Sequence, residues 1–263
     1  MADARPMALV TGASSGIGLE LARVLAREGH DVALVARREP ELTALADELR
    51  DAHGVAAHVI TADLSEPAAP EAVVKALTEA GRDVDILVNN AGFGGHGRFA
   101  ETDAGHERRM IAVNVAALTE LTKLLVPGMV ARGRGRVLNV ASTAAFQPGP
   151  FMAVYYATKA YVLSFSEALS EELSGSGVTV TALCPGAVPS GFQDAAGWSE
   201  DLPLRHAPGQ KSARQVAEAA YAGMMRGRRI VVPGTLNKVG VQAVRLSPRR
   251  VVTSVVRRLH PPD

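Results

Sequence analysis

Thr11-Gly-Ala-Ser-Ser-Gly-Ile-Gly18 decides the fold, because it joins an apolar run at residues 7–11 to a helical pattern at residues 17–28. Glycine has no Cβ, so a phosphate group can approach the backbone of such a turn and meet the positive end of the following helix. Glycine-rich turns before helices are common, but this one follows the first strand and therefore predicts a dinucleotide-binding site. The expected contacts are Gly12, Ser14, Ser15, Gly16, Ile17 and Gly18.

The alternation of strand and helix patterns continues along the chain. Further strands are predicted at residues 31–36, 55–61, 86–89, 136–140, 178–184 and 229–232. Helical patterns lie between them, at residues 40–52, 71–80, 107–132 and 155–169. Repeated β-α units at this spacing predict a single α/β domain with a doubly wound parallel sheet.

Composition excludes several classes of protein. The chain has 263 residues, 47% of them hydrophobic, so it can bury a large core. Its 28 basic and 27 acidic residues nearly cancel, which gives no overall field for nucleic acid. A single cysteine, Cys184, cannot form an internal disulfide or a cysteine metal cluster, so no metal site is expected and the cytoplasm is the default location. The first six residues are too short for a signal peptide, and no apolar run reaches the roughly 20 residues of a membrane span.

Two segments depart from the β-α pattern. Residues 185–210 contain four prolines and few periodic apolar positions, which predicts a variable, substrate-facing loop. Residues 234–263 form a basic extension beyond a domain at 1–233. If helical, the extension aligns Val251, Val252, Val255, Val256 and Leu259 in one stripe. One interpretation is a helix packed on the domain or on a subunit partner, and the other is peripheral contact with a membrane surface.

The end of the second strand distinguishes the two nicotinamide cofactors. An acidic residue there would bind the ribose hydroxyls of NAD and repel a 2′-phosphate. Here the positions hold Ala36, Arg37 and Arg38, and an arginine can pair with that phosphate. NADP(H) is therefore predicted, chiefly from Arg37. Arg37 and Arg38 are both expected cofactor contacts. The alternative is that both are ordinary solvated charges at a strand end, and Arg38 fits that alternative better than Arg37.

Two more strand ends carry candidate cofactor contacts. Asp63-Leu64 follows the third strand, where a carboxylate could bind the adenine amino group or cap the segment that starts near Ser65. Asn89-Asn-Ala-Gly92 follows the fourth strand. Its small residues, among them Asn90, Ala91 and Gly92, allow the backbone to lie close to a cofactor, and its asparagines could bond neighbouring strands.

Tyr155 and Lys159 are the candidate catalytic pair. Four positions apart in a helix, they lie on one face, and a lysine ammonium near a phenol lowers the phenol's pKa towards working pH. Tyr156 has Ala160 at the same spacing, so it is expected to be a packing residue.

Ser142 follows the fifth strand, where its hydroxyl could polarise a carbonyl or simply belong to a turn. Asn114 lies inside a helical pattern that it disfavours, which indicates a kink or a polar role.

With these pieces in order, the chain resembles the short-chain dehydrogenase/reductase family over nearly its whole length. Thr11–Gly18 matches the family's TGxxxGxG turn, residues 89–92 match its NNAG element, and Tyr155 with Lys159 match its YxxxK pair. Asn114 and Ser142 fall where the family has its other catalytic residues, and residues 184–188 look like its PG motif.

The resemblance implies a seven-stranded parallel sheet of the Rossmann type and hydride transfer between nicotinamide and a carbonyl or secondary alcohol. Tyr155 would exchange the proton, Lys159 would hold the nicotinamide ribose, Ser142 would orient the substrate oxygen and Asn114 would support a water relay. Further cofactor contacts would come from Pro185, Gly186, Val188 and Ser190, although Ser190 stands where the family commonly has threonine. Ser15 replaces a basic residue of many NADP-preferring members. Members are commonly dimers or tetramers joined through the long helices.

Several functions remain open on this basis. The leading prediction is a carbonyl reductase for a lipophilic small molecule, since Phe146, Met152, Phe192 and Trp198 lie in segments that would border the substrate. A reductase of 3-oxoacyl thioesters is the alternative enzyme, although residues 189–210 lack a basic cluster. An isomerase or dehydratase on a similar fold is a further alternative. A non-catalytic NADP(H) sensor is the alternative of another class, and it would not need all four catalytic positions.

Overall fold

Seven parallel strands form one sheet in the computed structural model, which describes residues 5–189, 191–192, 197 and 209–261. The strand order is β3-β2-β1-β4-β5-β6-β7, with parallel pairing throughout. The strands are β1 (Met7–Thr11), β2 (Asp31–Ala36), β3 (Ala57–Thr61), β4 (Val84–Asn89), β5 (Gly135–Val140), β6 (Val178–Leu183) and β7 (Ile230–Val231). The predicted seven-stranded, doubly wound α/β sheet is confirmed.

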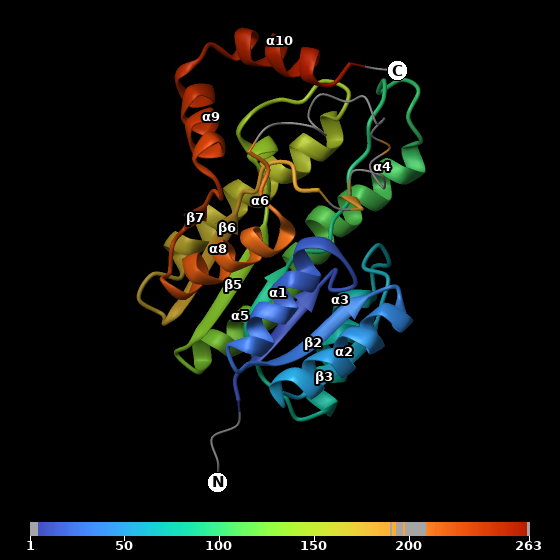
Figure 1. Ribbon diagram of the computed structural model, residues 1–263, viewed down its shortest axis with the longest axis vertical. Coiled ribbons are helices and arrows are strands. Elements are labelled where there is room, and N and C mark those ends of the chain that lie inside the picture. The colour runs from blue at the N-terminus through green and yellow to red at the C-terminus, as the bar shows by residue number, and fades with distance from the viewer. Residues whose placement is uncertain (1–4, 190, 193–196, 198–208, 262–263) are drawn as a thin grey trace.

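Helices cover both faces of the sheet (Figure 1). They are α1 (Gly16–Arg27), α2 (Glu39–His53), α3 (Ala69–Glu79), α4 (Ala104–Ile111), α5 (Leu118–Ala131), α6 (Ala153–Glu172), α8 (Ala213–Met225), α9 (Thr235–Leu246) and α10 (Arg249–Leu259). Two irregular turns, η1 (Ala112–Ala117) and η2 (Thr143–Phe146), complete the described elements. Most boundaries agree with the sequence patterns to within three residues.

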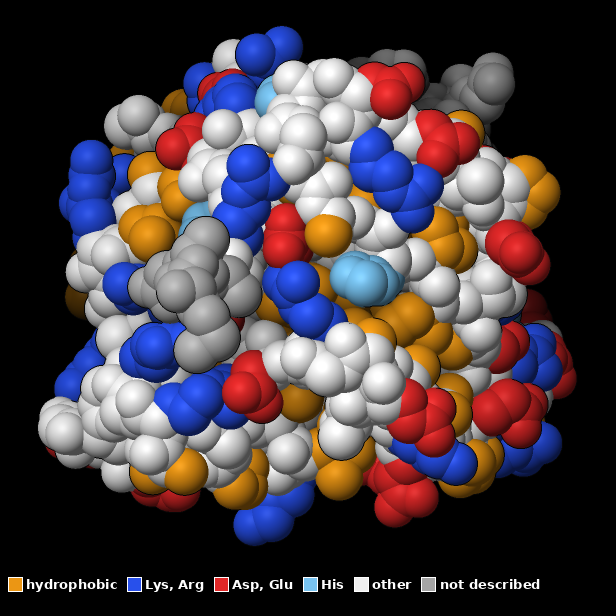
Figure 2. Space-filling model, turned by 90° about the horizontal axis from the view of Figure 1, so that it is seen from below, with side chains coloured by type: hydrophobic (Ala, Val, Ile, Leu, Met, Phe, Trp, Pro, Cys, Tyr) orange, Lys and Arg blue, Asp and Glu red, His pale blue; other side chains and the backbone are white. Residues whose placement is uncertain are grey.

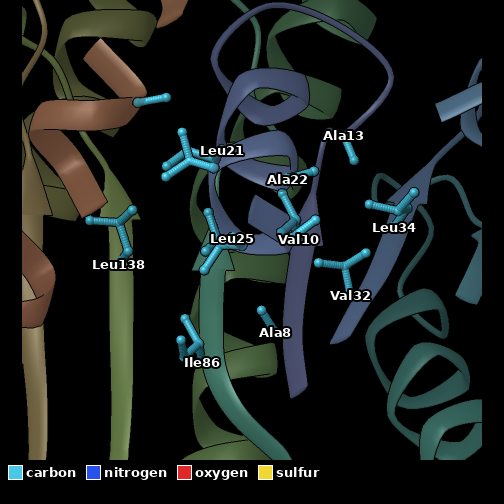
Figure 3. Packing of buried hydrophobic residues seen from close by; sticks show 14 of the residues in the cluster. Ala8, Val10, Ala13, Leu21, Ala22, Leu25, Val32, Leu34, Ile86 and Leu138 are labelled. Carbon is cyan, nitrogen blue, oxygen red and sulfur yellow. The ribbon is translucent and has the colours of Figure 1, made fainter. Parts of the chain in front are cut away.

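The strands are apolar on both faces because successive side chains enter different cores. Ala8 and Val10 of β1 pack with α1, α2 and α8, and Figure 3 shows Ala22 of α1 beside Val10. Met7 and Leu9 of the same strand pack on the opposite face with residues of α3 and α5. This double burial fixes β1 in the centre of the sheet.

The order of the strands reverses direction between β1 and β4. From β1 the chain builds outwards to β2 and β3, and then crosses to the other side of β1 to form β4 to β7. Neighbouring β-α connections therefore diverge at this point, and open α/β sheets bind ligands in the resulting crevice at the carboxyl ends of their strands. The glycine turn lies at this place in the sheet.

One helical run, Ala104–Ala131, comprises α4, η1 and α5. By length and composition it could cross a membrane, with a hydropathy of 1.4, and it is the one such candidate among the described residues. Such a run is weak evidence for a span, because core helices meet the same criteria. Met110, Leu121 and Met129 are each at most 2% exposed here, as expected of a helix that covers a sheet.

The two ends of the molecule differ. The N-terminus emerges at one end, whereas α10 crosses the other, where the strands have their carboxyl ends (Figure 1). Figure 2 views the N-terminal end, on which basic and acidic side chains lie side by side. The extension after β7 folds back as α9 and α10, and Val241, Val252 and Val256 are the buried residues of these two helices. Of the two sequence interpretations, packing on the domain is thus seen for this part of the extension.

Candidate active site

The glycine turn is clamped to the end of β4. Asn90 Nδ2 donates to the carbonyl oxygens of Thr11 at 2.8 Å and Gly12 at 3.2 Å. In return, Thr11 Oγ1 accepts from the backbone N–H groups of Asn90 and Ala91, each at 3.0 Å. Gly12 and Gly16 have φ of +66° and +57°, a left-handed conformation that glycine adopts without steric cost. The turn and the NNAG element therefore form one structural unit.

The turn fits a pyrophosphate. Helix α1 starts at Gly16, its N-cap Ser15 makes no side-chain capping bond, and its first turn carries no acidic residue, all within the described residues. The N–H groups of that turn are thus not used by a cap, and the positive end of the helix dipole is not neutralised. The residues present therefore match the chemistry of a dinucleotide's phosphates.

Gly18 allows α1 to lie against the turn. A Cβ at this position would be 2.3 Å from both Asn90 Nδ2 and the Gly12 carbonyl oxygen. We expect Gly18→Ala to displace the clamp, to lower the free energy of unfolding by about 1–3 kcal/mol and to abolish tight dinucleotide binding. Urea unfolding and titration with NADPH followed by fluorescence measure the two effects.

Gly240→Ala is the matched control, since Gly240 lies inside α9 and a Cβ there would contact nothing within 4 Å. Alanine is the better helix former, so the control is expected to be neutral or to stabilise by up to about 1 kcal/mol. A Gly18→Ala protein that binds NADPH as tightly as wild type would show that close packing at Gly18 is not needed for the site.

The two arginines after β2 lie differently from the expectation. Arg38 Nη2 donates to the carbonyl oxygen of Ser14 at 3.2 Å and to its hydroxyl at 3.0 Å, so Arg38 lies on the glycine turn. Arg38 remains 52% exposed, so it is a solvated charge that also contacts the glycine turn. The Arg37 side chain is 74% exposed, and its Nη1 lies 3.9 Å from Asp63 Oδ2. Both cations thus lie just after the carboxyl end of β2.

Asp63 caps its own turn. Its Oδ1 accepts from the backbone N–H and the hydroxyl of Ser65, at 2.9 Å and 2.8 Å. Burial acts to raise the pKa of the Asp63 carboxyl, but the Ser65 hydrogen bonds and the charge of Arg37 outweigh it and leave the pKa below its usual value. The capping alternative is thus seen, while the adenine contact stays a prediction. Leu64 is only 7% exposed and packs in the core, so its backbone is the part that could meet a cofactor.

Asn89 and Gly92 of the NNAG element have different structural roles. Asn89 is 3% exposed, and its Nδ2 donates to Thr122 Oγ1 at 3.0 Å and to Asn139 Oδ1 at 2.9 Å, which ties β4 to α5 and β5. Gly92 lies between the catalytic candidates: a Cβ on it would be 2.9 Å from Asn114 Oδ1 and 3.4 Å from Lys159 Nζ. The structure therefore brings Gly92, Asn114 and Lys159 together.

Asn114 lies in η1, a π-helical turn between α4 and α5. Its Nδ2 donates to the Phe93 carbonyl at 3.0 Å and to Thr158 Oγ1 at 3.1 Å, while its Oδ1 accepts from the Phe93 N–H at 3.1 Å. The buried amide is accommodated in the helix because all three of these hydrogen bonds satisfy it, and π-helical turns of this kind are frequent at functional sites. The predicted kink and polar role coincide at this residue.

Tyr155 and Ser142 meet at the carboxyl end of the sheet. Ser142 caps η2, and its Oγ accepts from the Ala144 N–H at 3.1 Å and donates to the Pro185 carbonyl at 3.4 Å. The Tyr155 residue is 8% exposed. Burial raises the pKa of Tyr155 to about 12, and a hydrogen bond with Ser142 acts against that rise. The Ser142 hydroxyl therefore lies close enough to the phenol to affect its pKa.

Lys159 does not act on the tyrosine as predicted. Its Nζ donates to the Val140 carbonyl at 2.8 Å and lies 5.8 Å from the centre of the Tyr155 ring. Burial lowers the pKa of Lys159 to about 8, against the opposing effect of Cys184. The expected lowering of the Tyr155 pKa is not seen, because desolvation outweighs every opposing effect on the phenol.

The PG motif lies beside Ser142. The Pro185 carbonyl accepts from the Thr143 N–H at 2.8 Å as well as from Ser142. A Cβ on Gly186 would be 2.6 Å from Asn237 Oδ1 of α9, so glycine is needed there for the approach of the extension. Val188 is 8% exposed. Ser190 lies outside the described residues, as do Trp198 and most of the predicted variable loop.

An apolar cluster surrounds the tyrosine. Met152 is 2% exposed and shares the cluster with Tyr155, and the Phe192 ring centre lies 5.4 Å from that of Tyr155. Phe146 belongs instead to a different cluster, with Arg245 stacked 5.4 Å above its ring. Two of the predicted substrate neighbours therefore border the catalytic candidate.

Sequence reasoning missed the contribution of the extension. Val252 and Val256 of α10 pack in the same cluster as Tyr155, and His260 Nε2 is 2.8 Å from the Tyr156 hydroxyl. The valine stripe was the available signal, but nothing in the sequence showed what it would cover. Thr158, which holds Asn114 in place, carried no signal of its own.

Comparison with known proteins agrees with this site. The Streptomyces coelicolor protein named "Putative ketoacyl reductase" is 44% identical over 184 residues, 69% of this chain and 70% of the relative. A short-chain dehydrogenase from Sphingobium yanoikuyae in complex with NADPH has a TM-score of 0.81 at 38% identity, covering 91% of this chain and 93% of that chain. A short-chain dehydrogenase/reductase from Burkholderia phymatum in complex with NAD also has a TM-score of 0.81, at 29% identity and 92% coverage of each chain. The model of the short chain dehydrogenase family matches residues 6–200, and this chain therefore belongs to that family of oxidoreductases.

Proposed function

We propose that this chain is an NADP(H)-dependent oxidoreductase that interconverts a carbonyl group and a secondary alcohol on a lipophilic small molecule. The observation that carries the proposal is the placement of the buried Tyr155 near Ser142 at the carboxyl end of the sheet, where a hydrogen bond with Ser142 acts against the rise in the pKa of the phenol. When bound, the nicotinamide supplies the hydride for the carbonyl carbon or accepts it from the alcohol.

The chain's own residues move the proton. In reduction, Tyr155 donates its hydroxyl proton to the carbonyl oxygen as the carbon gains hydride, so that an alcohol is formed. Ser142, which acts on the pKa of the same phenol, orients that oxygen. Lys159 and Asn114 flank Gly92, which supports their assignment to the nicotinamide ribose and to a water relay. With its pKa raised to about 12, Tyr155 stays protonated and serves as an acid over the whole neutral range.

The lining supports a lipophilic substrate. The cluster around Tyr155 contains Met110, Met152 and partly buried Phe192, and α10 adds two valines. These side chains favour apolar surface over charge, because transferring apolar area from water stabilises the complex. The name of the Streptomyces coelicolor relative favours a 3-oxoacyl thioester as the second candidate.

Arg37 supports NADPH over NADH. We expect Arg37→Asp to weaken NADPH binding by about 10- to 150-fold, since a charge-assisted hydrogen bond contributes about 1.5–3 kcal/mol and the new carboxylate repels the 2′-phosphate. NADH binding should be unchanged or stronger. Michaelis constants for both cofactors measure the shift. If wild type already prefers NADH, the assignment of Arg37 is wrong.

A panel of ketones, aldehydes and 3-oxoacyl thioesters tests the reaction, with NADPH loss followed by absorbance and NADH run in parallel. One NADPH should disappear for each alcohol formed. An isomerase or dehydratase would consume no NADPH. A non-catalytic sensor would bind NADPH, consume none with any substrate, and bind it equally well as the Tyr155→Phe variant.

The oligomeric state and the location of the enzyme are proposed by analogy with the family. We propose a homodimer or homotetramer joined through the α4–α5 run and α6, on which Ile111, Leu124 and Tyr161 are exposed apolar residues. We propose a cytoplasmic location, with a small molecule as substrate and no nucleic-acid partner. Light scattering of the purified protein measures the subunit count.

A further inference from the structure

The outward surface of the C-terminal helices has no cover among the described residues. Figure 1 shows α10 lying across the end of the molecule, with α9 rising to it. We propose that this outward surface, made of α9 and α10 and called here the terminal surface, binds an anionic lipid membrane. The proposal goes beyond the reaction above and does not depend on it.

Helix α10 has two apolar sides. Val252 and Val256 face inwards, at 7% and 3% exposure, and pack in the Tyr155 cluster. Val251, Val255 and Leu259 follow one another at intervals of four residues and are 54%, 49% and 38% exposed. The valine stripe predicted from the sequence is thus wider than the domain can bury, and half of it faces outwards.

Helix α9 continues the outward apolar surface. Leu236 and Val239 are 65% and 62% exposed, and Leu246, at the end of the helix next to α10, is 89% exposed. Ala243 is exposed at the helical spacing between them. Six of the exposed large hydrophobic residues therefore lie on these two short helices. Exposed apolar residues that gather in this way mark an interaction surface, unlike scattered single ones.

The charge of the terminal surface is of one sign. Between Glu218 and Asp263 the chain has nine basic residues and no acidic one. Six of the nine are exposed on α9 and α10, namely Lys238, Arg245, Arg249, Arg250, Arg257 and Arg258. The opposite end of the molecule mixes both signs (Figure 2). An interfacial helix combines an apolar side with a basic side in the same way, and each basic residue near an anionic membrane contributes about 1 kcal/mol.

This charge also argues against a second copy as the occupant. A two-fold contact through the terminal surface would place the basic residues of one copy against the same residues of the other, with no acidic residue from this segment to pair with them. An anionic lipid surface supplies negative charge and apolar depth together. Docking there would bring α10, and with it the apolar cluster around Tyr155, to the membrane from which a lipophilic substrate could enter.

Vesicle co-sedimentation of the full chain tests the proposal. Wild type should sediment with vesicles that contain phosphatidylserine and not with phosphatidylcholine alone, and added salt should weaken the binding. Arg250→Gln with Arg258→Gln should lower the partition coefficient by about 30-fold, as two charges are lost. Val251→Ser with Val255→Ser should lower it by about tenfold.

Matched control substitutions lie far from the terminal surface. Val130 of α5 is 39% exposed and Lys75 of α3 is 75% exposed, so Val130→Ser and Lys75→Gln remove the same kinds of group elsewhere. Both should leave vesicle binding unchanged. Thermal unfolding verifies that each variant is folded.

Three results would overturn the proposal. The first is no sedimentation of wild type with phosphatidylserine vesicles. The second is a Val251→Ser, Val255→Ser double variant that has a smaller oligomeric mass in light scattering than wild type but binds vesicles equally well. This result would mean that the terminal surface is a contact between copies of the chain. The third is retention of an acidic carrier protein, but not of vesicles, by the same surface.

Discussion

Tyr155→Phe is expected to reduce kcat for carbonyl reduction by about 100- to 10,000-fold, the range that positioned proton transfer contributes. Phenylalanine keeps the ring in the apolar cluster with Met152 and Phe192 and removes only the hydroxyl. NADPH affinity should therefore be unchanged. Steady-state kinetics with a substrate from the panel, together with fluorescence titration of NADPH, separates the two quantities.

Tyr156→Phe is the control for the loss of a buried phenol. Tyr156 is 7% exposed, follows Tyr155 directly, and its hydroxyl forms a hydrogen bond with His260. The Tyr156→Phe variant should have a free energy of unfolding about 1 kcal/mol lower than wild type and a kcat near that of wild type. Equal losses of kcat in the two variants would mean that packing of the cluster, and not proton transfer by Tyr155, limits the reaction.

The fold and the outline of the site follow from local sequence patterns. The glycine turn could be read because strand, turn and helix signals are adjacent, and the sheet followed because each apolar run has turn residues at its end. Asn114 was recognisable because asparagine conflicts with its helix. The π-helical turn itself could not be predicted, since it depends on hydrogen bonds to Phe93 and Thr158 from other segments.

Interactions between distant segments limited the prediction. The sequence ranked Arg37 above Arg38, yet Arg38 reaches back 24 residues to Ser14. It also placed Lys159 close enough to lower the pKa of Tyr155, because helical spacing gives the shared face but not the depth of burial. The position of α10 over the tyrosine cluster depends on how the whole extension folds back, which no local pattern specifies.

Lys159→Met should lower activity and raise stability. Lys159 is 5% exposed, and burial moves the pKa of its ammonium from 10.5 to about 8, which corresponds to about 3 kcal/mol of unfavourable free energy at neutral pH. Methionine fills similar space without charge. It leaves the Val140 carbonyl without this donor, which costs about 1 kcal/mol. Unfolding free energy should therefore rise by about 1–2 kcal/mol, while kcat/KM falls by about 100-fold or more.

The stability difference between Lys159→Met and wild type should depend on pH if it comes from the buried charge. It should not depend on pH if it comes from better packing by methionine. Between about pH 8 and 10.5 the folded lysine is neutral while the unfolded lysine still holds its proton, so the unfolded state binds more protons and wild type gains stability as pH rises. The advantage of the variant should be complete below about pH 8 and should shrink towards pH 10.5. Urea unfolding of both proteins at about pH 7 and about pH 10 measures it.

Lys75→Met is the matched control, because Lys75 is 75% exposed and should show no such window. A Lys159→Met protein less stable than wild type at neutral pH would mean that the bond to Val140 outweighs the cost of burying the charge. An advantage that is the same at both pH values would place its origin in packing. Only a shrinking advantage shows that the fold carries a buried cation at a cost, which is what a lysine kept for cofactor and substrate chemistry implies.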